Sequence, residues 1–273
     1  MNINKLFIIL VLSFFQISLS QIEFNQNNNI VVVKNEFELQ NAWAGGMNFC
    51  QFSKIDLNID GYDDLFIFDR SGKNGTINAN RIMPFLFDSD INGYIYAPEY
   101  ITLFPELENW VLLLDYNSDN KADIFTSNNS SIAVYTNTSE NQLSFEFYKV
   151  LTSDAGFGPI NVYVSGSDIP AIVDVDDDSD IDILTFDPSG SHLYFHENKS
   201  MQLYNNTDSI NLVRSDNCWG RFKEDFSTNS VTLNLDEDCN EIDNEGRFAH
   251  SGSTVLALDL DPSNNQGLEV LLG

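Results

Sequence analysis

An acidic pattern of nine residues recurs along the chain at a constant interval, and this repetition is the strongest constraint on the fold. The pattern is "DLNIDGYDD" at Asp56, "DYNSDNKAD" at Asp115 and "DVDDDSDID" at Asp174, so that 59 residues separate each start from the next. A stretched version, "DLDPSNNQGLE", begins at Asp259, 85 residues after the third. A fixed period of this size indicates one structural unit that is repeated along the chain.

Short apolar runs lie on both sides of each acidic loop. "WVLLLD" precedes the second loop and "DIFTS" follows it, while the third loop has "PAIVDV" before it and "DILTFD" after it. Runs of this length, bounded by Gly, Pro, Asn or Ser, are typical of β-strands. Two further runs, such as "SIAVYTN" and "LSFEFYKV", complete a unit. The sequence therefore predicts about four strands per unit and no long helix.

Four strands in about 60 residues match one blade of a β-propeller, in which four-stranded sheets pack around a channel. We therefore predict an all-β propeller with blades starting near residues 50, 110, 170 and 254. A β-sandwich and a β-solenoid are alternatives, but neither accounts for the 59-residue period. A closed ring of six or seven blades needs on the order of 360 to 420 residues. We expect an incomplete ring in a fragment of a longer protein, with a four-bladed ring as the alternative.

Oxygen-bearing side chains occupy alternate positions of each loop. Positions one, three, five and nine carry Asp or Asn, and position seven can offer its main-chain carbonyl. Alternate residues of a tightly curved loop point inward, and such a set of oxygen ligands suits a hard cation, so we predict Ca2+ as the bound ion. The predicted ligands are Asp56, Asn58, Asp60, Tyr62 and Asp64, then Asp115, Asn117, Asp119, Lys121 and Asp123, then Asp174, Asp176, Asp178, Asp180 and Asp182.

The loops are not EF-hands, which need a Glu at position twelve and flanking helices. Position twelve is Ile67, Thr126 or Thr185 here. An isolated loop of this kind would be read as an ordinary Asp- and Asn-rich turn, but the shared register of three loops favours metal binding. The fourth loop departs from the pattern because Pro262 interrupts the alternation and a Glu ends it. Its candidate ligands are Asp259, Asp261 and Glu269.

Residues 1–20 have the composition of a secretory signal peptide. One Lys precedes an apolar run from Leu6 to Phe15, and Ser18 and Ser20 provide small residues before a cleavage site. A transmembrane helix needs about 20 apolar residues, so we expect an exported protein without a transmembrane segment and a propeller over residues 21–273. The net charge of −28 makes nucleic acids and anionic membranes poor partners, because phosphate groups would be repelled.

Two of the three cysteines lie in a segment at about residues 214–245, which lengthens the third unit and reads as an insertion. Cysteines of exported proteins meet an oxidising compartment, so we predict a disulfide between Cys218 and Cys239 that pins the insertion. We expect Cys50 to be a buried free thiol. His192 and His196 lie four residues apart on an expected strand, which places them on one face. A zinc site there is an alternative to ordinary packing.

The units resemble FG-GAP/VCBS-type repeats, the calcium-loop blades of integrin-α-like β-propellers. Stretches such as "AWAGGMNFCQFSKIDLNIDGYDDLFIFDRSG" and "VYVSGSDIPAIVDVDDDSDIDILTFD" are similar to secreted VCBS-repeat proteins of Bacteroidetes. The resemblance covers most of residues 40–273. It implies a noncatalytic extracellular propeller, no established ligand, and a type IX secretion sorting domain in the longer protein, since such proteins often carry one.

The sequence contains no obvious catalytic constellation. The nucleophile elbow G-x-S-x-G is absent, and many of the acids belong to the four loops. We therefore expect a secreted or cell-surface module for binding or adhesion, stiffened by calcium, whose ligand is an unknown extracellular protein or glycan. A carbohydrate-binding propeller and a glycan-degrading enzyme on the same scaffold are the alternatives.

Overall fold

The computed structural model describes residues 27–28, 30–71, 82–225, 228, 230–235, 239, 254–260 and 267–273. Within these residues strands account for 45% and helices for 5%, which confirms the all-β class. The chain divides into two units, Met1–Trp43 and Ala44–Gly273. The predicted signal peptide, residues 1–20, lies outside the described residues.

The described part of the first unit contains one short hairpin. Strand β1 (Val33–Lys34) pairs antiparallel with β2 (Phe37–Glu38). Asn35 and Glu36, which join them, both have positive φ angles of 51° and 68°. Two such residues form the tight turn whose twist suits a two-residue hairpin. All four strand residues are exposed, so this hairpin adds nothing to a core.

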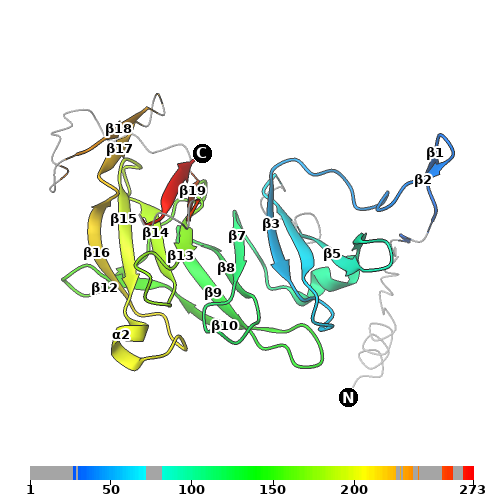
Figure 1. Ribbon diagram of the computed structural model, residues 1–273, viewed down its shortest axis with the longest axis horizontal. Helices are drawn as coiled ribbons and strands as arrows, with labels where there is room; N and C mark the ends of the chain where they lie inside the picture. The colour runs from blue at the N-terminus through cyan, green and yellow to red at the C-terminus, as the bar shows by residue number, and fades with distance from the viewer. Residues whose placement is uncertain are drawn as a thin grey trace, which may run out of the picture. The chain divides into compact units, whose positions relative to one another are not determined.

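The second unit begins with a four-stranded antiparallel sheet in the order β3-β4-β5-β6 (Figure 1). Its strands are β3 (Cys50–Ile55), β4 (Asp64–Asp69), β5 (Ile82–Asp88) and β6 (Gly93–Tyr96). The first acidic loop joins β3 to β4, because Ile55 pairs with Asp64 where the two strands meet.

The second sheet repeats this arrangement in the order β7-β8-β9-β10. Its strands are β7 (Val111–Leu114), β8 (Asp123–Asn128), β9 (Ser131–Asn137) and β10 (Phe145–Val150). The second acidic loop joins β7 to β8, and Leu114 pairs with Asp123. Each of these two sheets is therefore a four-stranded meander whose first connection is an acidic loop.

The third sheet has six strands in the order β12-β11-β16-β15-β14-β13. Its strands are β11 (Thr152–Asp154), β12 (Pro159–Asn161), β13 (Ala171–Val173), β14 (Asp182–Phe186), β15 (Leu193–Asn198) and β16 (Leu212–Trp219). Strands β13 to β16 form the same meander, and the third acidic loop joins β13 to β14. The hairpin of β11 and β12 extends it, because β11 pairs in parallel with β16. Four strands per unit were expected, so this hairpin is an addition that the sequence did not indicate.

Two hairpins follow the third sheet. Strand β17 (Phe222–Glu224) pairs with β18 (Val231–Leu233), and β19 (Val255–Leu258) pairs with β20 (Glu269–Leu272). The fourth acidic loop joins β19 to β20, as the other three loops join the first two strands of their sheets. Because β16 continues to Trp219, the segment outside the third sheet starts later than the predicted residue 214.

The described helices are short. A 3-10 helix, η2 (Pro98–Leu103), connects the first two sheets, and α2 (Ser200–Tyr204) lies between β15 and β16. In the part of the chain that the structure describes, no helix has the length and apolar character needed to cross a membrane.

Three apolar clusters hold successive sheets together, and each of them takes residues from two neighbouring sheets. The first contains Phe66, Phe68 and Ile82 with Val111 and Ile124; the second Phe125, Ile132 and Val134 with Ile183 and Leu212; the third Ala171, Leu184 and Phe186 with Val255 and Ala257. A fourth cluster, of Ile67, Met83 and Phe85, lies within the first sheet. Successive residues of a strand point to opposite faces. Ile124 accordingly belongs to the first cluster and Phe125 to the second, so the second sheet is buried on both faces.

This packing predicts that Phe125→Ala strongly destabilises the protein. The ring is 0% exposed and fills the space between the second and third sheets. Truncation of such a side chain leaves a cavity and lowers the free energy of unfolding by about 3 to 5 kcal/mol, as measured by urea denaturation. Phe157→Ala is the control, because Phe157 is 75% exposed. Equal effects of the two substitutions would contradict the assignment of the core.

Candidate functional site

The first three acidic loops curl around the carboxylate at position one in the same way. In the first loop, Asp60 N–H donates to Asp56 Oδ1 at 3.1 Å and Gly61 N–H donates to Asp56 Oδ2 at 2.8 Å. The corresponding distances are 3.2 and 2.8 Å at Asp115, and 3.1 and 2.9 Å at Asp174. Position one is therefore the centre of each turn.

Positions four and six of each loop have left-handed backbone angles. The φ values are 61° and 86° for Ile59 and Gly61, 62° and 63° for Ser118 and Asn120, and 62° and 79° for Asp177 and Ser179. This region is rare for residues other than glycine, and for the β-branched Ile59 it is unusual. The contacts of the loop with its own acids therefore outweigh a local backbone cost of about 1 kcal/mol or more for each such residue.

Positions three, five and seven form a second set of contacts inside the loops. Asn58 Oδ1 and Asn117 Oδ1 each accept the N–H of position five at 3.1 Å. The position-five carboxylate accepts the N–H of position seven at 2.9 Å in the first two loops and at 3.0 Å in the third. The predicted side-chain ligands at positions one, three and five are thus gathered within one turn of chain, and positions seven contribute their N–H groups to it.

Position nine is a buried carboxylate that fastens the loop to its sheet. Asp123 and Asp182 are 0% exposed, and Asp64 is 1% exposed. Asp182 Oδ2 accepts the N–H of Val175 within the loop at 2.9 Å, and its Oδ1 accepts the N–H of Asn198, the last residue of β15, at 2.7 Å. The same two contacts recur at Asp64, with Leu57 and Phe87, and at Asp123, with Tyr116 and Asn137. Sequence reasoning assigned these residues only as metal ligands and missed this anchoring role.

The third loop brings its carboxylates closest together. Oxygen atoms of Asp174, Asp176 and Asp182 lie within 4.8 Å of one another, and the described residues contain no other cluster of three carboxylates that close. Asp180 is 2% exposed; its Oδ2 accepts the N–H of Met201 at 2.9 Å, while its Oδ1 has no hydrogen-bond partner. Crowded carboxylate oxygens and one buried oxygen without a donor suit a hard cation with oxygen ligands.

The fourth loop retains one contact of the others. Leu260 N–H donates to Glu269 Oε2 at 2.9 Å, as position two donates to position nine in the first three loops. Gly267, two residues before Glu269, has a φ of 90°. Glu269 therefore makes the loop contact of the anchor, although its side chain is only partly buried. Asp259 begins the loop, and the predicted ligand Asp261 lies outside the described residues.

Three acids of the third loop have strongly raised pKa values. Burial raises the pKa of Asp182 to about 7; the N–H groups of Asn198 and Val175 act in the opposite direction, and the neighbouring carboxylates raise it further. Burial and nearby carboxylates likewise raise the pKa of Asp176 and of Asp180 to about 6. In the second loop, the pKa of Asp123 is raised to about 6, again chiefly by burial. These groups resist ionisation because burial and the neighbouring carboxylates disfavour their charged form.

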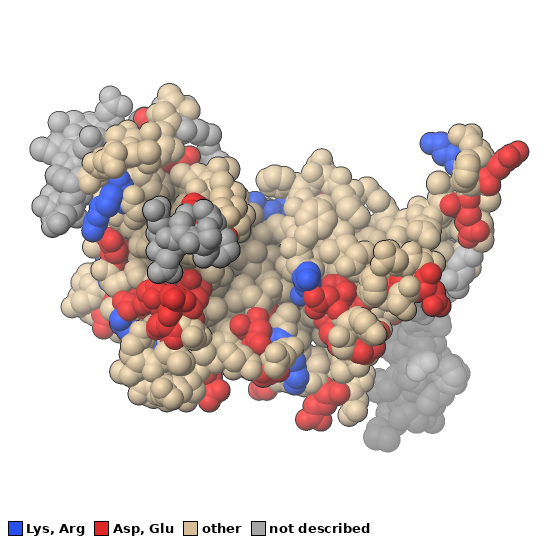
Figure 2. Space-filling view, viewed as in Figure 1, with Lys and Arg blue, Asp and Glu red and all other residues tan. Residues whose placement is uncertain are grey.

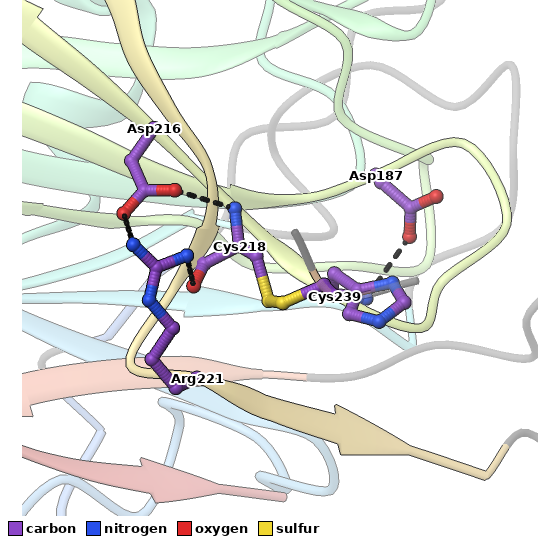
Figure 3. Close-up of a disulfide and its surroundings, with 6 residues drawn as sticks. Asp187, Asp216, Cys218, Arg221 and Cys239 are labelled. Carbon is purple, nitrogen blue, oxygen red and sulfur yellow. Dashed lines mark hydrogen bonds and ion pairs between the residues drawn. A yellow bond between two sulfur atoms is a disulfide. The ribbon is translucent and has the colours of Figure 1, made fainter. Parts of the chain in front are cut away.

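The Cys218 and Cys239 side chains form a disulfide, with Cα atoms 6.3 Å apart (Figure 3). Cys218 lies in β16, and Arg221 closes the turn behind it by pairing with Asp216 at 3.5 Å. The bond encloses a separation of 21 residues, which is worth roughly 3 kcal/mol in the chain-entropy model. Cys50 is free and only partly buried in β3, and burial raises the pKa of its thiol.

The two histidines of the alternative zinc site have separate surroundings. β-Bulges between Leu193 and His196 interrupt the alternation that would place them on one face. His196 is buried, with Nε2 at 3.2 Å from Thr185 Oγ1, and burial lowers its pKa to about 3. His192 instead lies beside the disulfide, so that the described cluster containing it holds Cys218 and Cys239 and not His196.

The raised pKa values predict how stability depends on pH when divalent metal is removed by a chelator. Between about pH 4 and pH 7 the folded chain binds protons at Asp123, Asp176, Asp180 and Asp182 more tightly than the unfolded chain does. The free energy of unfolding should therefore fall as the pH rises through this window, and Asp182→Asn should reduce the slope. Urea denaturation in chelator between about pH 5 and pH 8 measures it. A stability that increases with pH would contradict the arrangement.

The disulfide predicts one linked pair of peptides. Tryptic mapping of the purified protein without reduction should join the peptides that contain Cys218 and Cys239 and leave the Cys50 peptide open to alkylation. Reduction before digestion, as the control, should separate the pair. A linkage that includes Cys50 would contradict the pairing.

Comparison with known proteins finds no relative of this chain. No protein-family model matches it, and neither a curated protein nor a solved structure does.

Proposed function

We propose that this chain is a noncatalytic binding or adhesion module of a secreted or cell-surface protein, and that calcium bound in its acidic loops stabilises it. The observation that supports this most is the threefold repetition of one loop geometry. Asp at position one is the centre of the turn, and a buried Asp at position nine fastens each loop. An ordinary turn does not need three or four acids held in one orientation at three places in a chain.

The proposed ion fits the third loop best. Asp174, Asp176 and Asp182 supply converging oxygens, and Asp180 Oδ1 is a buried oxygen without a donor. Calcium, when bound, supplies the positive charge that these groups lack. The main-chain N–H groups of the loop position these oxygens. In the first two loops the corresponding metal ligands are the side-chain oxygens of the acids and amides at positions one, three, five and nine.

We further propose that the four-stranded sheets are blades of a β-propeller of the FG-GAP/VCBS type. Consecutive meanders that share an apolar cluster between them support this arrangement. The β19–β20 hairpin and its cluster with β13 and β14 agree with the start of a further blade. The signal-like N-terminus and the disulfide both favour export, since disulfides persist in oxidising compartments.

The surface charge agrees with a binding role that does not involve nucleic acid. Figure 2 shows acidic side chains gathered in separate patches, the densest beside α2, with few basic residues between them. Contacts of Asp178 and Asp180 with α2 place the third loop at that position. A surface of this charge repels phosphate backbones and attracts divalent cations.

Calcium should raise the melting temperature of the protein. Extracellular calcium modules have dissociation constants of about 0.1 to 1 mM, so 10 mM free calcium stabilises each site by roughly 1.4 to 2.7 kcal/mol. Three sites would raise the melting temperature by roughly 10 to 30 °C over that in chelator. Magnesium should rescue poorly because it retains its water shell. Differential scanning calorimetry in chelator, magnesium and calcium measures the effect.

Single-residue variants test the contribution of each loop to the calcium-dependent shift in melting temperature. Asp60→Ala, Asp119→Ala or Asp178→Ala should each remove about a third of the calcium-dependent shift, because each change takes one charged ligand from one loop. Asp208→Ala is the matched control, since Asp208 is exposed and lies in none of the loops. Identical melting curves in chelator and in calcium would show that the acids are solvated turns and would reject the proposal.

A further inference from the structure

A pocket of about 550 Å³ opens beside α2, and none of its lining residues is a candidate ligand of the acidic loops. Its wall is formed by the ends of β10, β11 and β12, by α2, and by the first residues of β16. Leu203 and Val213 are its exposed aliphatic lining residues, whereas Ile210 and Leu212 also belong to the buried second cluster. The volume lies in the range of sites for small molecules, which are mostly apolar with a few placed polar groups.

Lys149 is the polar group that is least well satisfied in this pocket. Its Nζ donates to the main-chain oxygen of Ile210 and lies 5.0 Å from the centre of the Tyr148 ring. No carboxylate oxygen of the described residues lies within 4.0 Å of it, whereas Lys54, Lys199 and Arg221 each have an acidic partner. Burial lowers the pKa of Lys149, with no charged neighbour to offset it.

Lys149 is not alone in lacking an ion pair, because the partly buried Arg70 donates instead to the main-chain oxygens of Asn109 and Ser167. Lys149 differs in that its ammonium lies at a pocket and has a single carbonyl acceptor among the described residues. A half-buried ammonium has lost part of its hydration, and a carbonyl oxygen does not compensate a full charge. The position of Lys149 thus favours an anion that comes from outside the chain.

The other charged residues of the pocket leave Lys149 Nζ available to that anion. Asp154 is the one acid of the lining, and its Oδ1 accepts N–H groups of Gly156 and Gly158 at 2.8 and 3.1 Å. Lys199, the second cation of the lining, is paired with Glu197. Neither Asp154 nor Glu197 pairs with Lys149, so a ligand carboxylate at its Nζ would not have to displace an ion pair.

The α2 wall of the pocket is held in place. Met201 N–H donates to Asp180 Oδ2 at 2.9 Å, and Gln202 Nε2 donates to Asp178 Oδ2. On the other side, Ser200 Oγ donates to the main-chain oxygen of Ser209 at 2.6 Å. Leu203 is left 62% exposed at the pocket. A preformed wall reduces the entropy that binding would cost.

We propose that this pocket binds small organic carboxylates with an aliphatic body. The carboxylate pairs with Lys149 Nζ, and the aliphatic part lies along Leu203 and Val213. An ion pair with a partly dehydrated ammonium is a strong, short contact. Among the described residues, no aromatic side chain lines the pocket, so these residues offer no stacking platform for a sugar ring. No lining residue is a candidate metal ligand, so the carboxylate pairs with Lys149 and not with an ion of the acidic loops.

Hexanoate and hexanamide are the probes for a titration followed by methyl NMR. Hexanoate should bind with a dissociation constant of about 1 mM, which is ordinary for a ligand of this size, and should shift the methyl signals of Leu203 and Val213. Hexanamide has the same shape without the charge and should bind at least about tenfold more weakly. Equal binding of the two probes, or no shifts of these signals at about 50 mM hexanoate, would overturn the proposal.

Variants identify the cation. Lys149→Met should weaken hexanoate binding at least about tenfold and leave hexanamide binding unchanged. Lys34→Met alters the net charge equally at an exposed residue that does not line the pocket, and should have no effect. Leu203→Glu changes a largely exposed side chain and, without disturbing the fold, should also weaken hexanoate by repulsion. Unchanged hexanoate binding in Lys149→Met or in Leu203→Glu would overturn the assignment.

Discussion

The buried aspartate that ends each acidic loop is the contact on which the rest of the arrangement depends. Asp64, Asp123 and Asp182 each accept one N–H from their own loop and one from the third strand of their sheet. A carboxylate that is almost fully buried is costly unless both oxygens are satisfied. This requirement fixes where the loop begins, how it turns and which strand it meets.

That anchor also explains why the other acids are crowded. Once position nine is fixed inside the sheet, the short connection must curl, and positions one, three and five turn toward the same space. The backbone accepts left-handed residues such as Ile59 and Asp177 to do so. The price is electrostatic: two carboxylates about 4 Å apart repel by roughly 4 kcal/mol at an effective dielectric constant of 20. The fold therefore concentrates negative charge that only protons or a cation can neutralise.

The sequence predicted the features that depend on local pattern. The acidic loops, the strands on either side of them and the cysteine pairing could all be read from spacing and composition. Features that depend on distant neighbours could not. The β11–β12 hairpin consists of three-residue strands without apolar alternation, and it joins the sheet by pairing in parallel with β16, far along the sequence. The surroundings of Lys149 likewise depend on a distant residue, because its Nζ donates to the main-chain oxygen of Ile210, 61 positions away.

Two carboxylates of the third loop also bind α2, and these contacts connect the loop with the pocket beside Lys149. Asp178 and Asp180 each use one oxygen to hold α2. A carboxylate has about four lone-pair directions on two oxygens. When one oxygen accepts an N–H, the other oxygen of the same carboxylate can still bind a cation. Asp180 keeps Oδ1 free of donors for that purpose. A cation in the loop would draw these carboxylates together while they remain bonded to the helix, and would thereby stiffen the wall of the neighbouring pocket. The acids of the third loop therefore shape the loop and also hold α2 in place. The first loop has no such second role at position seven, where it carries the exposed Tyr62.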